Sequence, residues 1–199
     1  MSNPAISRPL PPERIDEVLR QADLLYSPDE IRLAYDRMAF AITQTLAETL
    51  GRYGNPLILA VPIGGLFPAM EIIPRLDFPL EVDYIHATRY QGETAGGRLR
   101  FLARPRICLK DRTVIVIDDI LDEGITLAAI LDFCRDSGAR AVFSAVLAQK
   151  QHERKPAIRH ADFTGLAVED RYVFGCGMDY KGYLRNLRGI YAVKGGNIN

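Results

Sequence analysis

Residues 114–127 read VIVIDDILDEGITL, which predicts a strand, a tight turn and the start of a helix. The unbroken apolar run over 114–117 is typical of a strand buried on both faces of a parallel sheet. Two acids, Asp118 and Asp119, end the run, Gly124 marks the turn, and apolar residues then recur at helical spacing over 125–137. The stretch therefore places carboxylates beside a helix N-terminus.

The neighbouring sequence extends this stretch into a βαβ unit. Gly138 is expected to end the helix, and residues 141–148 form another strand-like apolar run. On the N-terminal side, the patterns predict a buried strand over 56–61, a helix over 66–76 and a strand over 80–87. The predicted fold class is α/β, with a central parallel sheet flanked by helices.

The N-terminal region adds a long helix and a tail. Ser27, Pro28 and Glu30 make a capping box, and the apolar spacing that follows predicts a helix over 28–50. Four prolines in residues 1–12 predict an irregular tail. The polar, glycine-rich residues 91–98 predict a mobile loop. No internal repeat interrupts the 199 residues, so we expect a single domain over 1–199.

Composition excludes several classes of protein. The 25 basic and 25 acidic side chains cancel, which argues against binding nucleic acid through bulk charge. The three cysteines form no CxxC pair, so we expect reduced thiols and no zinc site. No stretch has the length and apolar character of a signal peptide or a membrane span. The sequence therefore predicts a cytoplasmic protein with no membrane partner.

The turn after residue 121 has the chemistry of a phosphate site. Free N–H groups at the start of a helix bind anions, and ligands of open α/β sheets lie outside the carboxyl ends of the strands. The amides of residues 123–126 would hold the phosphate while the acids meet a sugar or a cation. An alternative interpretation remains open, in which the acids are solvated and Asp122 caps the helix.

The same stretch resembles the phosphoribosyl pyrophosphate signature of the type I phosphoribosyltransferases. From residue 56 to residue 193, the order of motifs is similar to that of the hypoxanthine-guanine phosphoribosyltransferases. The matching motifs are Ile63-Gly64-Gly65, Arg89-Tyr90 with the glycine-rich run, Lys150 after a strand, Arg171-Tyr172-Val173, Phe174-Gly175, Met178-Asp179-Tyr180 and Arg185.

The resemblance implies a parallel-sheet domain with a small C-terminal hood over about 160–190 and a flexible lid that begins near Arg89. It also implies transfer of a phosphoribosyl group from phosphoribosyl pyrophosphate to hypoxanthine or guanine, giving IMP or GMP and pyrophosphate. These proteins are usually dimeric or tetrameric, so we expect a homodimer or a homotetramer.

The resemblance also implies roles for the sugar-phosphate residues. The 5′-phosphate would lie on the residues from Glu123 to Thr126, which include Gly124 and Ile125. Asp118 and Asp119 would meet the ribose hydroxyls, and their charge would stabilise the positive charge that develops at C1. Asp122 is expected to be the general base that accepts the purine N7 proton.

Base and pyrophosphate binding are assigned in the same way. Lys150 is only a donor, so it suits a purine that carries O6 rather than the amino group of adenine. Tyr172 would stack on the purine, and the backbone of Val173 would read its N1 and C2 edge. Gly64 and Arg185 would hold pyrophosphate, and Asp179 would contact Mg²⁺, which needs few protein carboxylates.

The chain departs from the family pattern at three positions. Many members have a cation where Ile63 stands, Thr where Glu123 stands and Lys where Ile125 stands, so we expect a differently balanced pyrophosphate site. Two other functions stay open: preference for xanthine, and regulation through RNA binding by a protein with this fold. The neutral charge disfavours the second.

Overall fold

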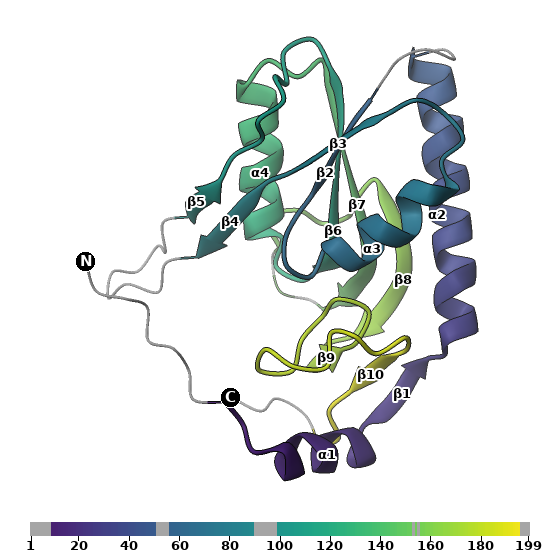
Figure 1. Ribbon diagram of the computed structural model, residues 1–199, viewed down its shortest axis with the longest axis vertical. Helices are drawn as coiled ribbons and strands as arrows, with labels where there is room; N and C mark the ends of the chain where they lie inside the picture. Colours follow the sequence, from purple (N-terminus) through teal and green to yellow (C-terminus); the bar gives the residue numbers. More distant parts are fainter. Residues whose placement is uncertain (1–8, 51–55, 90–98, 153, 155, 196–199) are drawn as a thin grey trace.

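The computed structural model describes residues 9–50, 56–89, 99–152, 154 and 156–195 (Figure 1). A five-stranded parallel sheet forms its centre, with the strand order β3-β2-β6-β7-β8. The central sheet comprises β2 (Leu57–Ala60), β3 (Glu81–Tyr84), β6 (Thr113–Leu121), β7 (Ala141–Gln151) and β8 (Phe163–Glu169). The predicted fold class, a central parallel sheet flanked by helices, is confirmed.

Helices cover both faces of this sheet. The helices α2 (Pro28–Leu50) and α3 (Leu66–Ile72), followed by a 3₁₀ turn over Ile73–Arg75, pack on one face, while α4 (Ile125–Asp136) packs on the other (Figure 1). Alternate residues of β6 therefore enter different cores: Ile115 joins the α2 side and Val116 the α4 side. Because both faces are covered, these strands are continuous apolar runs.

The predicted capping box begins α2. Glu30 Oε2 accepts hydrogen bonds from the Ser27 amide at 2.8 Å and from its hydroxyl at 2.7 Å. At the other end of the domain, Gly138 follows α4 with φ +83°. Both predicted helix boundaries are confirmed, because each depends on a local backbone requirement.

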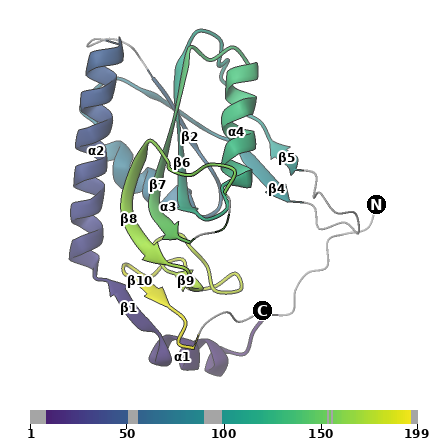
Figure 2. The ribbon, with the colours of Figure 1, turned by 180° about the vertical axis from the view of Figure 1, so that it is seen from behind.

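A second, three-stranded sheet forms the hood, with the antiparallel order β1-β10-β9. It joins β1 (Asp23–Tyr26) to β9 (Val173–Phe174) and β10 (Ile190–Ala192), with α1 (Pro12–Gln21) beside it (Figure 2). Phe174, Tyr180 and Val193 form its buried core. The N-terminal segment therefore completes a layer that the sequence assigned to the C-terminal third.

Two predicted boundaries near the hood are wrong. The range of about 160–190 begins too early, because β8 pairs with β7 in the central sheet. The irregular tail predicted over 1–12 is too long, because Pro12 is the first residue of α1, a position that tolerates a missing N–H. Residues 1–8 of that tail lie outside the described residues.

Three strand predictions also need correction. The strand predicted over 80–87 is two strands in different sheets, β3 and β4 (His86–Arg89), and β4 pairs with β5 (Leu99–Ala103). β6 does not end at residue 117 but continues through Asp118 and Asp119 to Leu121. Lys150 lies within β7 rather than after it.

The predicted lid falls between β4 and β5, and its loop over 91–98 lies outside the described residues. No helix within the described part of the chain is long and apolar enough to cross a membrane.

Candidate active site

The turn between β6 and α4 presents an uncapped helix N-terminus. Gly124 is the N-cap with φ +72°, and no described side chain caps the helix. A Cβ on Gly124 would lie 3.0 Å from Ile158 N and 3.0 Å from a Leu121 methyl carbon, so a side chain would be both strained and crowded. The alternative in which Asp122 caps the helix is therefore wrong, and the first amides of α4 are left for a ligand.

A polar cavity of about 300 Å³ lies over this turn. It brings together all of the predicted sugar-phosphate residues with both predicted pyrophosphate residues. The predicted residues that line it are Gly64, Asp118, Asp119, Asp122, Glu123, Gly124, Ile125, Thr126 and Arg185. The side chains of Ile63 and Ile125 also line this cavity and are 57% and 43% exposed, so apolar groups stand where many relatives are expected to have cations.

The paired acids Asp118 and Asp119 lie on the floor of this cavity. The Asp119 amide donates to Asp118 Oδ1 at 2.9 Å. Burial raises the pKa of both carboxyls, and the negative charge of Asp119 raises the pKa of Asp118 further. A Cβ on Gly64 would lie only 1.8 Å from Asp119 Oδ2, so any larger residue there would displace the Asp119 carboxylate.

A smaller cavity of about 170 Å³ lies against the hood. Its lining includes the residues predicted to bind the purine together with Ile120 and Met178, for which no individual role was predicted. Lys150, Tyr172, Val173 and Asp179 line this cavity but not the larger one, while Asp119, Ile120 and Asp122 line both. The two cavities are therefore adjacent, with Asp122 at their junction.

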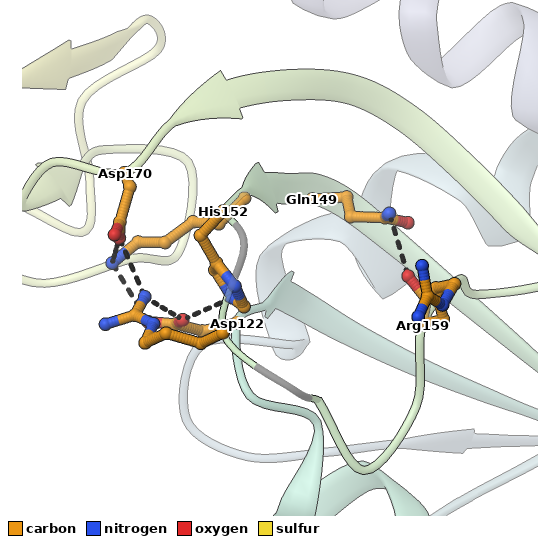
Figure 3. Close-up of polar contacts among 7 residues, drawn as sticks. Asp122, Gln149, His152, Arg159 and Asp170 are labelled. Carbon is orange, nitrogen blue, oxygen red and sulfur yellow. Dashed lines mark hydrogen bonds and ion pairs between the residues drawn. The ribbon is translucent and has the colours of Figure 1, made fainter.

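Asp122 is surrounded by nitrogen donors (Figure 3). Its Oδ2 accepts from Lys150 Nζ at 2.9 Å, its Oδ1 accepts from Arg154 Nη2 at 2.9 Å, and His152 Nε2 lies 3.1 Å from Oδ1. Arg154 also donates to Asp170 at 2.8 Å. No role was predicted from the sequence for His152, Arg154 or Asp170.

Strand pairing explains how this cluster forms. Leu121 at the end of β6 is paired with Gln149 of β7, so Asp122 lies beside Lys150. Side chains two apart in an extended chain point the same way, which brings His152 to the same carboxylate as Lys150. The Lys150-Gln151-His152 spacing at a strand end was the available sequence signal.

The hood supplies the remaining predicted residues. Asp179 Oδ1 pairs with Arg185 Nη2 at 2.7 Å, and Gly182 N donates to Asp179 Oδ2 at 2.6 Å. Arg185 Nη1 also donates to the carbonyl of Gly177 at 2.6 Å. The ring of Tyr172 packs edge-on against Tyr180, with centroids 5.5 Å apart. Internal hydrogen bonds therefore orient both the acid and the arginine.

The donor set suits a magnesium ion carried by substrate better than a protein-enclosed metal. No group of three or more His, Cys, Asp or Glu side chains that could hold a metal occurs in the described part of the chain. Each Asp179 oxygen has one partner above, so each has room for another. A single carboxylate with substrate oxygens and water fits Mg²⁺, which keeps several of its waters.

Comparisons with known proteins agree with this geometry. Residues 29–181 match the family model described as phosphoribosyl transferase domain. The chain is 30% identical over 172 residues to a hypoxanthine-guanine phosphoribosyltransferase of Streptococcus pneumoniae strain R6, covering 86% of this chain and 92% of that protein. It is 29% identical over 171 residues to a hypoxanthine-guanine-xanthine phosphoribosyltransferase of Tritrichomonas foetus, covering 86% and 91%. A solved hypoxanthine phosphoribosyltransferase of Staphylococcus aureus has the same fold, with a TM-score of 0.77 at 24% identity over 88% of this chain and 94% of that one.

Proposed function

The chain belongs to the phosphoribosyltransferase family, and from this premise we propose that it transfers the 5-phosphoribosyl group of phosphoribosyl pyrophosphate to hypoxanthine, guanine or both. The products are IMP or GMP and pyrophosphate, which places the enzyme in purine salvage. One observation carries the proposal: a polar cavity over an uncapped helix N-terminus adjoins a smaller cavity beside Lys150, and Asp122 lines both.

The 5′-phosphate binds at the start of α4 in this proposal. The amides from Glu123 to Thr126 and the Thr126 hydroxyl meet its oxygens, where the helix dipole contributes about 1 kcal/mol to anion binding. Asp118 and Asp119 meet the ribose hydroxyls. Their buried position suits this role, because a sugar hydroxyl donates to a carboxylate and offsets its cost of burial.

The purine occupies the cavity beside Lys150. The Lys150 ammonium donates to O6, Tyr172 packs on the ring, and the main chain of Val173 reads the N1 and C2 edge. Supporting this, β9 is an edge strand of the hood sheet, so the side of Val173 that faces away from β10 has no strand partner in the described chain. Adenine would present an amino donor to the ammonium donor, and this mismatch would favour a 6-oxopurine over adenine by about a hundredfold or more.

The reaction needs one proton transfer and one displacement. The N9 electron pair of the purine forms the bond to C1, the bond from C1 to the pyrophosphate oxygen breaks, and its electron pair leaves with pyrophosphate. The N7 proton passes to Asp122, which lines both cavities and so lies between base and sugar. The nearby carboxylates Asp118 and Asp119 stabilise the positive charge at C1.

Pyrophosphate is held by the backbone of Gly64 and the guanidinium of Arg185. Two of the five Arg185 N–H donors are used in the contacts described above, which leaves donors for the leaving group. Asp179 is the residue that would hold Mg²⁺. The bound ion would neutralise charge on the departing pyrophosphate, so removal of Mg²⁺ with a chelator should abolish turnover, and its return should restore it.

A single assay tests the function. Purified protein, Mg²⁺ and phosphoribosyl pyrophosphate are mixed with hypoxanthine, guanine, xanthine, adenine and uracil in turn, and nucleotide formation is followed by absorbance. We expect IMP and GMP but no AMP or UMP. The Tritrichomonas foetus relative includes xanthine in its name, so XMP formation alone would shift the proposal to a xanthine-preferring enzyme.

An RNA-binding regulator is the other candidate, and the same protein sample tests it. Uracil turnover alone, or RNA binding by a protein that forms no nucleotide, would overturn the proposed function. The neutral overall charge disfavours RNA binding.

We propose further that residues 1–199 form one phosphoribosyltransferase domain and that it assembles as a homodimer or a homotetramer in the cytosol. The cytosolic proposal is supported by the three free cysteines. Assembly is supported by exposed apolar side chains on α2 and α3: Phe40 is 67% exposed and Met70 is 75% exposed. Phe40→Glu should dissociate the oligomer in light scattering, and an unchanged mass would contradict this interface.

A further inference from the structure

Asp122 has more partners than a side chain needs for stability alone. Lys150 contacts Oδ2, whereas Arg154 and His152 both reach Oδ1. Asp170 lies on the far side of the cluster, 3.8 Å from Lys150 Nζ and 2.8 Å from Arg154 Nη2. The cluster therefore holds one carboxylate between three nitrogen groups, with a second acid balancing the two permanent cations (Figure 3).

His152 is the unusual member of this cluster. Its side chain is 5% exposed, whereas that of Arg154 is 49% exposed. Neither ring nitrogen of His152 has a well-aligned hydrogen bond to a described residue, and Asp122 is the carboxylate that Nε2 approaches. Burial of an imidazole without good hydrogen bonds is costly, so its position calls for a role beyond packing.

We propose that His152 is a positioning residue that fixes the carboxylate of Asp122 for proton transfer from the purine. This inference rests on the proposed function, because it assigns His152 to the general base of that reaction. The histidine itself lines neither cavity, so it acts through Asp122 rather than on substrate.

The pattern of contacts explains how positioning works. A carboxylate has about four lone-pair sites; Lys150 donates to one on Oδ2, Arg154 donates to one on Oδ1, and His152 Nε2 lies 3.1 Å from Oδ1. A second lone-pair site on Oδ2 would receive the N7 proton. Because Arg154 and the buried His152 ring both lie against Oδ1, rotation of the carboxylate is restricted.

The test compares two substitutions at this position. His152→Gln places an amide nitrogen near the position of Nε2 and keeps the contact, whereas His152→Phe fills the space without a donor. We expect kcat to fall about tenfold in the Phe variant, because the polar contact of Nε2 with the Asp122 carboxylate is lost, with KM for phosphoribosyl pyrophosphate changed less than about twofold. The Gln variant should recover most of the lost kcat.

A double-mutant cycle separates positioning from general damage. In the Asp122→Asn background, His152→Phe should have no further effect on kcat, because His152 acts through that carboxylate. His160→Phe is the matched control, since His160 contacts Gln149 and not Asp122. Thermal melting of each variant checks folding, and if the Phe variant does not fold, His152→Met is compared with His152→Gln instead.

Three results would overturn the inference: unchanged kcat in the donor-free variant, no recovery in the Gln variant, or an equal loss in the Asp122→Asn background. Failure of the proposed function is distinguishable, because the wild-type protein would then form no nucleotide from any base. In that case crystal structures of wild type and His152→Phe still decide the point, since an unmoved Asp122 carboxylate would contradict positioning.

Discussion

The two halves of the proposed active site, a sugar-phosphate cavity and a base cavity, are built in different ways. The sugar-phosphate cavity takes most of its lining from one continuous segment, residues 118–127, and presents main-chain amides at the start of α4. The base cavity is lined by three separated parts of the chain. These are residues 119–122, Lys150 of β7, and hood residues between Tyr172 and Asp179. One half therefore depends on local backbone geometry, and the other on side chains held by long-range pairing.

This difference predicts which substitutions each half tolerates. Main-chain contacts survive a change of side chain, so Glu123 and Ile125 can depart from the family pattern without removing the amides. The contacts of Lys150 and Asp122 would be lost on substitution, because each depends on one side chain in a defined ion pair.

The largest effect is expected at Asp122, on the side-chain half. Asp122→Asn should lower kcat by about 100-fold or more, because the loss of a general base removes that much rate acceleration. Its effect on melting temperature should be smaller than its effect on kcat, because Asp122 does not cap α4 and ion pairs of a carboxylate that is 38% exposed contribute little to stability. Steady-state kinetics and calorimetry measure both quantities, and an equal loss of stability and activity would contradict the assignment.

The second largest effect is expected at Lys150. Lys150→Met keeps much of the side-chain volume and removes the donor to O6, so kcat/KM for hypoxanthine should fall by about 10- to 100-fold while KM for phosphoribosyl pyrophosphate stays nearly constant. The ratio of kcat/KM for hypoxanthine to kcat/KM for adenine should fall as well. Lys110→Met, at an exposed lysine outside both cavities, serves as the control.

On the main-chain half, Gly124→Ala should matter more than Thr126→Val. The alanine must adopt φ +72° and approach Ile158, so we expect a loss of about 1–2 kcal/mol in stability and a rise of about tenfold in KM for phosphoribosyl pyrophosphate. Thr126→Val removes one hydroxyl and should raise that KM about threefold.

Gly138→Ala is the matched control for this pair. Gly138 also has a positive φ, but it lies after the opposite end of α4, where an added Cβ makes only ordinary contact with Lys110. It should lower stability with no change in KM. A larger KM effect from Thr126→Val than from Gly124→Ala would break the contrast between the two halves.

The smallest effect is expected at the paired acids Asp118 and Asp119. Their buried carboxyls serve the proposed reaction but lower the stability of the folded protein. Because the pKa of Asp118 is raised in the folded protein, the folded state binds this proton more tightly than the unfolded state, and stability falls as pH rises above about 3.9. Asp118→Asn should therefore raise the melting temperature of the ligand-free protein at pH 7.5 by about 2–4 °C, equivalent to about 1 kcal/mol.

The pH dependence of this gain is its critical test. The stabilisation should disappear near pH 3.5, where the wild-type carboxyl is protonated in both states. Asp132→Asn, at an exposed acid of α4, is the control and should show no such gain. A melting temperature lowered by Asp118→Asn at pH 7.5 would contradict the sign of the shift.

Much of the phosphate half could be predicted from the sequence. The apolar run before Asp118, the glycine at position 124 and the helical spacing after it are local requirements of a buried strand, a left-handed turn and an amphipathic helix. Each requirement involves residues that lie close together in the chain. The sequence was therefore sufficient to place the candidate anion site and to indicate the parallel sheet.

The other half depended on tertiary structure. The pairing of β6 with β7 brings Asp122 to Lys150, His152 and Arg154, and the pairing of β1 with β10 makes the N-terminal segment part of the hood. Strand register over such separations is set by the apolar pattern and packing of whole strands, so no single short stretch of the chain fixes which distant side chains meet. Sequence therefore determined which segment forms the candidate anion site, whereas only the folded sheet decided which distant side chains surround Asp122.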